Sequence, residues 1–151
     1  MAKIIEYSKE YEQAVRSLIV SIFVDEYGFE NYRESCANAK YEKYKDTNGN
    51  CWIALDSYGE VIGSIALIGL GEAEAKLEIM YVHNEYRGQG VAQDLYNALY
   101  NFAIENGIRK IILGTYERLG RAINFYKKNG FVEYEHNNYT YDDKYFYLDV
   151  V

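Results

Sequence analysis

One short turn holds the residue types that could bind an anionic cofactor. It joins a strand-like run, Leu77 to Val82, to a helix-like run that begins near Gly90, and it consists of Arg87, Gly88, Gln89, Gly90, Val91 and Ala92. Glycines let the backbone come close to an anion, Arg87 adds positive charge, and the free amides of a helix start point at the ligand along the positive end of its dipole. The turn therefore predicts a cradle for a pyrophosphate.

The same pattern is also typical of a plain loop before a helix, in which the glycines serve only the backbone geometry. The sequence lacks the Gly-Lys-Ser/Thr ending of a P-loop. It also lacks the third glycine, and the acidic residue about 20 positions later, that a dinucleotide-binding fold would show. The neighbouring residues must therefore decide between a cofactor site and a structural loop.

The strand before the turn carries a candidate general base. Period-two alternation places Leu77, Ile79 and Tyr81 on one face, and it places on the opposite face Glu78, Met80 and Val82. Apolar neighbours would desolvate Glu78 and make its carboxylate a usable base near neutral pH. The alternatives are a solvent-facing Glu78 or a Glu78 paired with a lysine, and Glu72 and Glu74 would substitute for it if the register were shifted.

Two separated motifs resemble one known family. The segment Leu77 to Ala92 resembles motif A of the GNAT superfamily of N-acetyltransferases, whose loop reads Arg/Gln-x-x-Gly-x-Gly/Ala. The segment Ile123 to Phe131 is similar to the family's motif B helix and its Tyr-x-x-x-Gly-Phe ending, here at Tyr126 and Gly130. The resemblance implies an α/β (mixed α+β) fold, with a central mixed, largely antiparallel sheet of about seven strands flanked by about four helices.

By that resemblance the co-substrate is acetyl-CoA, and its contacts are the main chain of Met80, Tyr81 and Val82 together with the turn from Arg87 to Ala92. A free amide around Tyr81 or Val82 would stabilise the tetrahedral oxyanion. The hydroxyl of Tyr126 would face the departing sulfur. Some amine-acetylating members have a glutamate at the place of Glu78, whereas many others carry it two residues earlier, where this chain has Lys76.

The implied reaction moves an acetyl group from acetyl-CoA to a primary amine of a small, cationic substrate, by direct attack in a ternary complex. Its catalytic residues would be Glu78 and Tyr126. Many relatives carry an asparagine ahead of the motif B helix where this chain has Leu119, so the contact made by that asparagine is in doubt here. A non-catalytic acyl-CoA sensor or interaction module on the same fold is the alternative function.

Hydrophobic periodicity predicts the elements that must position these residues. Strands are expected at 3–7, 51–55, 61–70, 75–82, 111–113, 132–136 and 144–147. Helices are expected at 11–24, at 31–45, from 91 to a terminator at Gly107, and at 121–129. The continuous apolar run at 111–113 is typical of a central strand covered on both faces, which a β-α-β crossover around the preceding helix would produce.

The chain has 151 residues with 16 basic and 23 acidic side chains, which gives a formal net charge of −7. This balance argues against nucleic acid and anionic membranes as partners. It favours a cationic acceptor, and polyamines, aminoglycosides and peptide lysines all fit. By the resemblance, acidic and tyrosine side chains after the first helix lie where relatives often build the acceptor wall, and the alternative is a solvated loop: Asp25, Glu26, Tyr27, Glu30, Tyr32 and Glu34.

A chain of this length without proline or a linker-like segment is expected to form a single GNAT-like acetyltransferase domain over residues 1–151. We find no signal-peptide core and no membrane-span-length run, so we expect a cytoplasmic protein. Neither cysteine forms a metal-ligand spacing with His83 or His136, so no metal is assigned, although Cys51 as a covalent acyl carrier is a remaining alternative. An aromatic tail would pack as a final hairpin or contribute to a homodimer, and it contains Tyr139, Tyr141, Tyr145, Phe146 and Tyr147.

Overall fold

The computed structural model describes residues 2–135 and 144–150. Its strands are β1 (Lys3–Glu6), β2 (Asn50–Leu55), β3 (Val61–Gly71), β4 (Glu74–Val82), β5 (Lys110–Thr115), β6 (Val132–Tyr134) and β7 (Lys144–Asp149). Its α-helices are α1 (Glu12–Ile19), α2 (Arg33–Ala37), α3 (Lys43–Asp46), α4 (Val91–Glu105) and α5 (Gly120–Lys128). Shorter helical segments are η1 (Lys9–Tyr11), the π-helical η2 (Val20–Glu26), η3 (Glu30–Tyr32) and η4 (Asn84–Tyr86).

The described strands form a 7-stranded sheet in the order β1-β2-β3-β4-β5-β7-β6. β4 and β5 run parallel, and the other neighbouring strands run antiparallel. The helix that connects the parallel pair is α4, as the β-α-β pattern predicted. The predicted fold class is confirmed, with α1 to α5 in the described residues where about four helices were expected.

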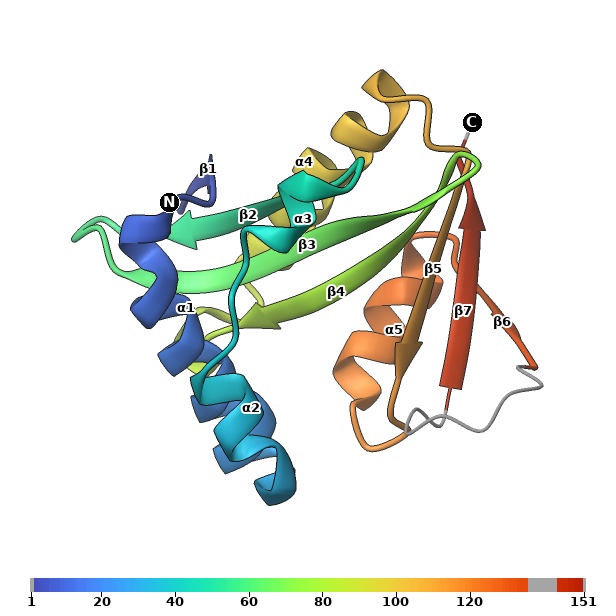
Figure 1. The fold of residues 1–151 in the computed structure, drawn as a ribbon. Helices are drawn as coiled ribbons and strands as arrows, with labels where there is room; N and C mark the ends of the chain where they lie inside the picture. The colour runs from blue at the N-terminus through green and yellow to red at the C-terminus, as the bar shows by residue number, and fades with distance from the viewer. Residues whose placement is uncertain (1, 136–143, 151) are drawn as a thin grey trace.

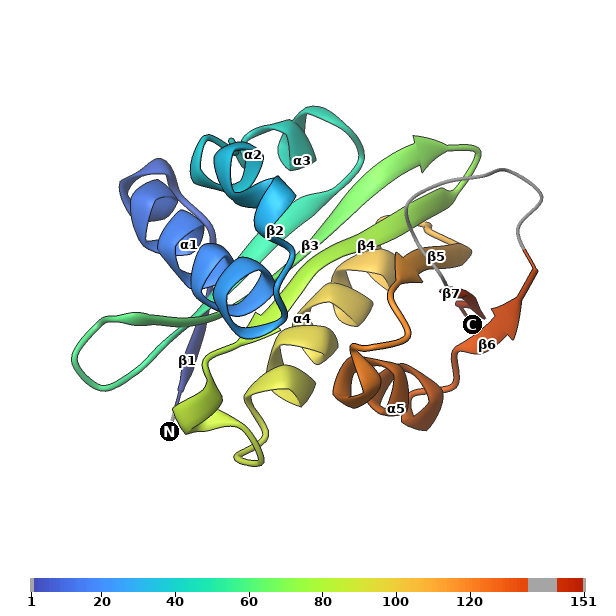
Figure 2. The same ribbon diagram turned by 90° about the horizontal axis from the view of Figure 1, so that it is seen from below.

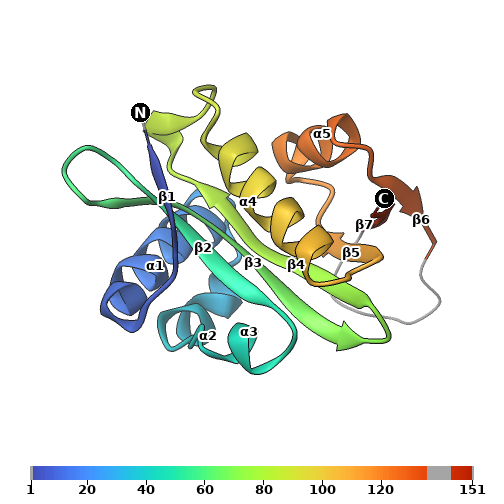
Figure 3. The same ribbon diagram turned by 90° about the horizontal axis from the view of Figure 1, so that it is seen from above.

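The helices cover the two faces of the sheet in separate groups. α1, α2 and α3 lie on one face, whereas α4 and α5 lie on the other (Figure 1, Figure 2 and Figure 3). One buried cluster packs α4 and α5 against the sheet through Leu95, Leu99 and Tyr126. A second cluster packs α1 and α3 against the opposite face through Val15 and Tyr44. Each face of the sheet therefore has its own core.

The parallel pair is joined over a short length. Its register pairs Glu74 with Lys110, Ala75 with Ile111 and Lys76 with Ile112. Beyond these pairs the two strands diverge (Figure 1), while β4 stays paired with β3 as far as Val82. One edge of β4 over residues 77–82 therefore faces a gap and presents backbone groups to it.

A bulge in β4 stands at the start of this gap. Between the pairs Ser64 with Tyr81 and Ala66 with Glu78, β4 has one more residue than β3. Ile79 adopts a left-handed backbone with a φ of +48°. A branched side chain rarely adopts this conformation, whose cost is on the order of 1–3 kcal/mol. The hydroxyl of the buried Ser64 donates a 2.6 Å hydrogen bond to the carbonyl of Ile79 and thereby holds the bulge.

The bulge corrects the predicted alternation along this strand. Ile79 and Tyr81 pack on the face covered by α1 to α3, and Glu78 reaches Tyr44 of α3 on that same face. Leu77, Met80 and Val82 pack on the face covered by α4 and α5. The predicted grouping of Glu78 with Met80 and Val82 is therefore wrong, because the extra residue makes two consecutive side chains share one face.

The helix predicted at 31–45 is divided into η3, α2 and α3. The side-chain amide of Asn38 donates to the carbonyl of Glu34 at 2.8 Å, which competes with the helical bonds at the end of α2. The following segment buries Tyr41 and Tyr44 against the sheet, which a continuous exposed helix would not achieve.

The C-terminal half keeps the predicted elements with small differences. β6 and β7 form the expected hairpin, while His136, Tyr139 and Tyr141 lie outside the described residues. β5 was predicted to be covered on both faces, but it alternates buried with half-buried residues because only its α4–α5 face is fully covered. Helix α4 ends just before the predicted terminator Gly107.

Candidate acyl-transfer site

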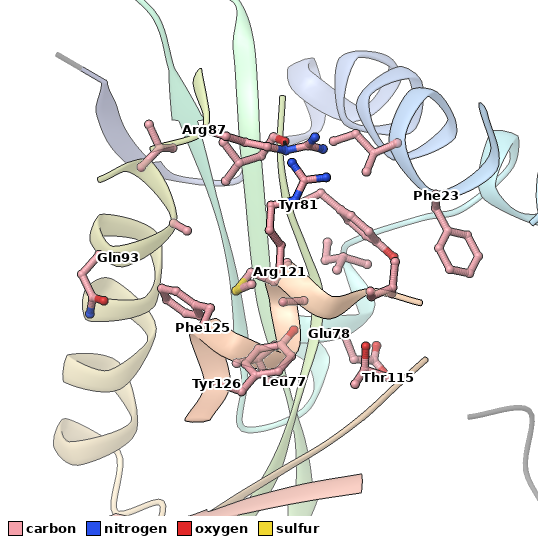
Figure 4. A pocket seen from close by; sticks show the side chains of 18 of the residues that line it. Phe23, Leu77, Glu78, Tyr81, Arg87, Gln93, Thr115, Arg121, Phe125 and Tyr126 are labelled. Carbon is pink, nitrogen blue, oxygen red and sulfur yellow. Dashed lines mark hydrogen bonds between the residues drawn. The ribbon is translucent and has the colours of Figure 1, made fainter. Parts of the chain in front are cut away.

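A cavity of about 590 Å³ lies where β4 and β5 diverge. It is bounded by β4, by the glycine turn and the first turn of α4, by α5 and by η2 (Figure 4). The residues predicted for the site that line it are Glu78, Met80, Tyr81, Val82, Arg87, Gly88, Gly90, Val91, Ala92 and Tyr126. The structure thus brings together two motifs that are separated in the sequence.

Gln89 and the two alternative bases, Glu72 and Glu74, do not line this cavity. Gln89 points elsewhere, and its side-chain amide donates to the carbonyl of Glu85 at 3.2 Å. Glu72 lies in the turn between β3 and β4, and Glu74 opens β4 beside Lys110 of β5. Neither glutamate therefore replaces Glu78 in the cavity.

The glycine turn offers open backbone to a ligand. Gly88 and Gly90 have φ values of +78° and +84°, which glycine adopts without steric cost. A Cβ at either position would meet nothing within 4 Å, so the turn faces open space. Gly90 is also the N-cap of α4, and no side chain of the described residues caps this helix. The first amides of α4 are therefore available to an anion, and the backbone fits the predicted pyrophosphate cradle.

The free edge of β4 adds a main-chain donor. The amide of His83 donates to the carbonyl of Ile62 on β3 at 2.8 Å. Because successive backbone amides of an extended strand point to opposite sides, the amide of Val82 points away from β3. The carbonyl of Val82 accepts a 3.1 Å bond from Nε of Arg87 on that outer side. A ligand lying in the gap would therefore meet the amide of Val82.

The guanidinium of Arg87 is held by Glu26 of η2. Its terminal nitrogens donate to the two carboxylate oxygens at 2.7 and 2.8 Å, and Arg121 of α5 donates to the same carboxylate at 3.1 Å. The hydrogen bonds from Arg87 hold the pKa of Glu26 below its ordinary value. This cluster ties η2, the glycine turn and α5 together, and Glu26 compensates part of the positive charge expected at the cradle.

Glu78 lies at the other side of the gap. Its Oε1 accepts a 2.9 Å hydrogen bond from the hydroxyl of Tyr44, and its Oε2 lies 3.9 Å from Nζ of Lys76. Burial and the nearby Glu78 carboxylate raise the pKa of Tyr44, so this hydroxyl stays protonated and donates. The side chain of Glu78 is 27% exposed and lines the cavity, so a substrate can reach the carboxylate.

Tyr126 approaches the gap from α5. Its ring is buried beside Phe131 and Phe146, and its hydroxyl points into the cavity (Figure 4). Burial raises the pKa of Tyr126. The group is therefore a neutral hydrogen-bond donor on the same side of the sheet as the glycine turn.

The cavity passes through the sheet at the gap. Gly90 and Tyr126 line it on the α4–α5 side, while Phe23 and Glu78 line it on the α1–α3 side. A cofactor bound at the turn and a second molecule bound beside Glu78 would meet between β4 and β5. This arrangement suits transfer of a group from one bound molecule to another.

Sequence reasoning missed Tyr44, Phe23 and Arg121. Tyr44 is 34 residues from Glu78, and no spacing rule connects the two side chains. Phe23 follows the core positions of the first helix and gave no separate signal. Arg121 lies in the first turn of α5, where a positive charge interacts unfavourably with the helix dipole. A cation at this unfavourable position could have indicated a functional residue.

Cys51 does not fit the role of an acyl carrier. It is 1% exposed within β2, it does not line the cavity, and burial raises the pKa of its thiol to about 12. Within the described residues, no three His, Cys, Asp or Glu side chains are grouped so that they could hold a metal ion. None of the described helices combines the length and apolarity needed to cross a membrane.

Comparisons with known proteins agree with this geometry. The model of the acetyltransferase (GNAT) family matches residues 12–131. N-acetyltransferase family 8 member 2 of Rattus norvegicus is 29% identical over 115 residues, which are 70% of this chain and 50% of that protein. The chain therefore spans about half the length of this relative.

Two solved structures illustrate the likeness in fold. An acetyltransferase of the GNAT family from Staphylococcus aureus MU50 superposes with a TM-score of 0.91 at 25% identity, with 100% of both chains covered. An aminoglycoside 6'-N-acetyltransferase complexed with coenzyme A shares the fold with a TM-score of 0.73 at 18% identity, over 99% of this chain and 97% of that one. The family match confirms the expected acetyl-CoA as co-substrate. The chain belongs to the GNAT family of acetyltransferases, whose acyl donor is acetyl-CoA.

Proposed function

We propose that this chain transfers the acetyl group of acetyl-CoA to a primary amine of a small molecule, by direct attack in a ternary complex. The observation that carries the proposal is the cavity through the sheet, with the glycine turn on one side and Glu78 on the other. The likeness to an aminoglycoside N-acetyltransferase supports an amine acceptor.

The acceptor must lose a proton before it can attack. An alkylamine has a pKa near 10.4, so it arrives protonated at neutral pH. Glu78 would take this proton directly or through a water, because its carboxylate lines the cavity and is held by Tyr44. The amine nitrogen then bonds to the thioester carbonyl carbon, and the carbon–sulfur bond breaks as the tetrahedral intermediate collapses. The second proton of the nitrogen passes to the departing thiolate, directly or through a water, so that the products are the amide and the free thiol.

Two groups of the chain would stabilise the charges that develop. The amide of Val82 faces the gap and is suited to the oxyanion. Tyr126 would donate a hydrogen bond to the departing sulfur. A thiol has a pKa near 8.5 and an ordinary tyrosine a pKa near 10, so the thiolate is a weaker base than tyrosinate. Burial raises the pKa of Tyr126 further. Complete proton transfer is therefore uphill, and polarisation by a hydrogen bond is the role that fits.

A thiol-release assay across a panel of primary amines tests the proposal. We expect acetyl-CoA to bind, and thiol to be released with at least one amine well above background hydrolysis. Glu78→Gln should lower kcat/KM about a hundredfold, the lower end of the range for loss of a general base. Glu72→Gln, outside the cavity, is the matched control and should leave the rate unchanged.

Tight binding of acetyl-CoA without thiol release from any amine would replace this proposal with a non-catalytic acyl-CoA sensor. An unchanged rate in Glu78→Gln would remove Glu78 from the mechanism while leaving acetyl transfer in place.

A further inference from the structure

The charge inside the cavity is opposite to the charge of the whole chain. The net charge of −7 would favour a polycationic acceptor. Among the described residues, however, Glu78 is the acidic side chain that lines the cavity, and the basic ones are Lys76, Arg87, Arg121 and Lys128. A second ammonium group would therefore find no further carboxylate among the described residues of the lining.

The acidic residues after the first helix do not supply the missing charge. Glu26 is bonded to Arg87 and Arg121, and Asp25 and Glu30 both pair with Arg33, at 2.6 and 2.8 Å. None of these acids, nor Glu34, lines the cavity. The structure therefore does not place these carboxylates in the lining: Glu26 is bound by Arg87 and Arg121 from distant segments, and Asp25 and Glu30 are bound by the nearby Arg33.

Aromatic and branched apolar side chains, instead of an acidic wall, lie beside Glu78. Phe23 lies with its ring centroid 6.2 Å from Tyr81 and 6.1 Å from Tyr116, and all three rings line the cavity. Ile22 and Ile79 line the same side. Phe29, beneath these rings, already makes a cation–π contact with Arg118, whose guanidinium lies 3.9 Å from the centroid of the Phe29 ring. The rings of Phe23, Tyr81 and Tyr116 therefore offer apolar contact to the body of a substrate.

We propose that the acceptor is a monoamine whose single amine is carried on an aromatic or compact apolar body, and that polyamines and aminoglycosides are poor substrates. The inference rests on the function proposed above. The one ammonium group is held at Glu78, and the apolar body lies against Phe23 and Tyr81. Lys76, 3.9 Å from the Glu78 carboxylate, repels any further cation that approaches this end of the cavity.

The test compares kcat/KM for 2-phenylethylamine, spermidine and an aminoglycoside, measured by thiol release with the full chain. We expect 2-phenylethylamine to exceed the other two by at least about tenfold, which corresponds to about 1.4 kcal/mol. Lys76→Glu should shift the ratio toward spermidine by about tenfold, and Lys76→Gln should give a smaller shift in the same direction. Lys9→Glu makes the same charge change outside the cavity and should leave the ratio unchanged.

The aromatic contact is tested separately. Phe23→Leu should lower kcat/KM for 2-phenylethylamine several-fold more than for ethylamine, because ethylamine cannot reach the ring; equal losses for both amines would contradict the contact. A preference for spermidine or the aminoglycoside in the unmodified protein would overturn the inference and leave amine acetylation standing, as would an unchanged ratio in Lys76→Glu. Absence of thiol release with every amine would overturn the proposed function and this inference with it.

Discussion

The hydroxyl of Tyr44 donates a 2.9 Å hydrogen bond to the carboxylate of Glu78, although 34 residues separate them in the chain. Tyr44 is almost completely buried beneath the face of the sheet that carries Glu78. The bond fixes the direction of the carboxylate toward the cavity, and Nζ of Lys76 on β4 lies 3.9 Å from the same carboxylate. Tyr44 is thus a positioning residue for the proposed base.

Tyr44→Phe removes this bond and keeps the ring. We expect kcat/KM to fall about tenfold, equivalent to about 1.4 kcal/mol. Because the carboxylate loses the partner that fixes its direction, the loss should fall on kcat, while the Kd for acetyl-CoA should change by less than about twofold. Steady-state kinetics gives the first quantity and calorimetry the second. An equal loss in kcat and in acetyl-CoA binding, accompanied by a lower Tm, would assign Tyr44 a structural role alone.

Tyr126→Phe removes the donor proposed for the departing sulfur. The ring beside Phe131 and Phe146 is preserved, so the Tm should change little. We expect kcat to fall about tenfold while the Kd for acetyl-CoA stays within about twofold, because the bond is strongest as charge develops on sulfur. Steady-state kinetics and calorimetry separate the two quantities. An unchanged kcat would exclude Tyr126 from the reaction.

Gly90→Ala tests the anion cradle against a matched glycine. Gly90 and Gly59 have φ values of +84° and +81°, and a Cβ at either meets nothing within 4 Å, so both substitutions should cost about 1–2 kcal/mol in strain. Only Gly90→Ala should raise the KM for acetyl-CoA, by about tenfold, because Gly59 lies in the β2–β3 turn. An equal KM for acetyl-CoA in the two variants would show that its diphosphate binds away from the glycine turn.

Glu26→Gln should change how stability depends on pH. The pKa of Glu26 is lowered from 4.5 by hydrogen bonds from Arg87, so its contribution to stability is present above about pH 4.5 and is lost as the pH falls through the lower folded value. We expect the variant to be less stable than the unmodified protein at pH 7 by up to about 1 kcal/mol, and the difference to be smaller at pH 3 than at pH 7.

Denaturant unfolding at the two pH values measures this difference. Glu105→Gln, an exposed glutamate at the end of α4, serves as the control. A difference between Glu26→Gln and the unmodified protein that stays constant down to pH 3 would contradict an ionic contribution from the Glu26 cluster.

The sequence predicted those parts of the fold and site that depend on local pattern. The strand, glycine turn and helix around Arg87 follow from backbone chemistry within one segment, and Gly88 and Gly90 have the positive φ that their residue type suggested. Tyr126 of the motif B-like helix lies in the same cavity. Because this helix is distant from the glycine turn in the chain, only the resemblance to a known family predicted that the two segments meet.

The remaining parts depend on tertiary contacts that no local pattern encodes. The bulge at Ile79 depends on a hydrogen bond from Ser64 on another strand, so period-two alternation failed from that residue onward. Glu26 was visible after the first helix, but its partners Arg87 and Arg121 come from distant segments. Its pairing could therefore not be predicted.

Beyond Lys76, the edge of β4 that faces β5 has no neighbouring strand among the described residues to pair with. A donor molecule lying along that edge would supply the hydrogen-bond partners that an adjoining strand supplies elsewhere, so occupancy and rigidity would rise together. Resistance of the protein to heat and to proteolysis would then track the local abundance of its own co-substrate.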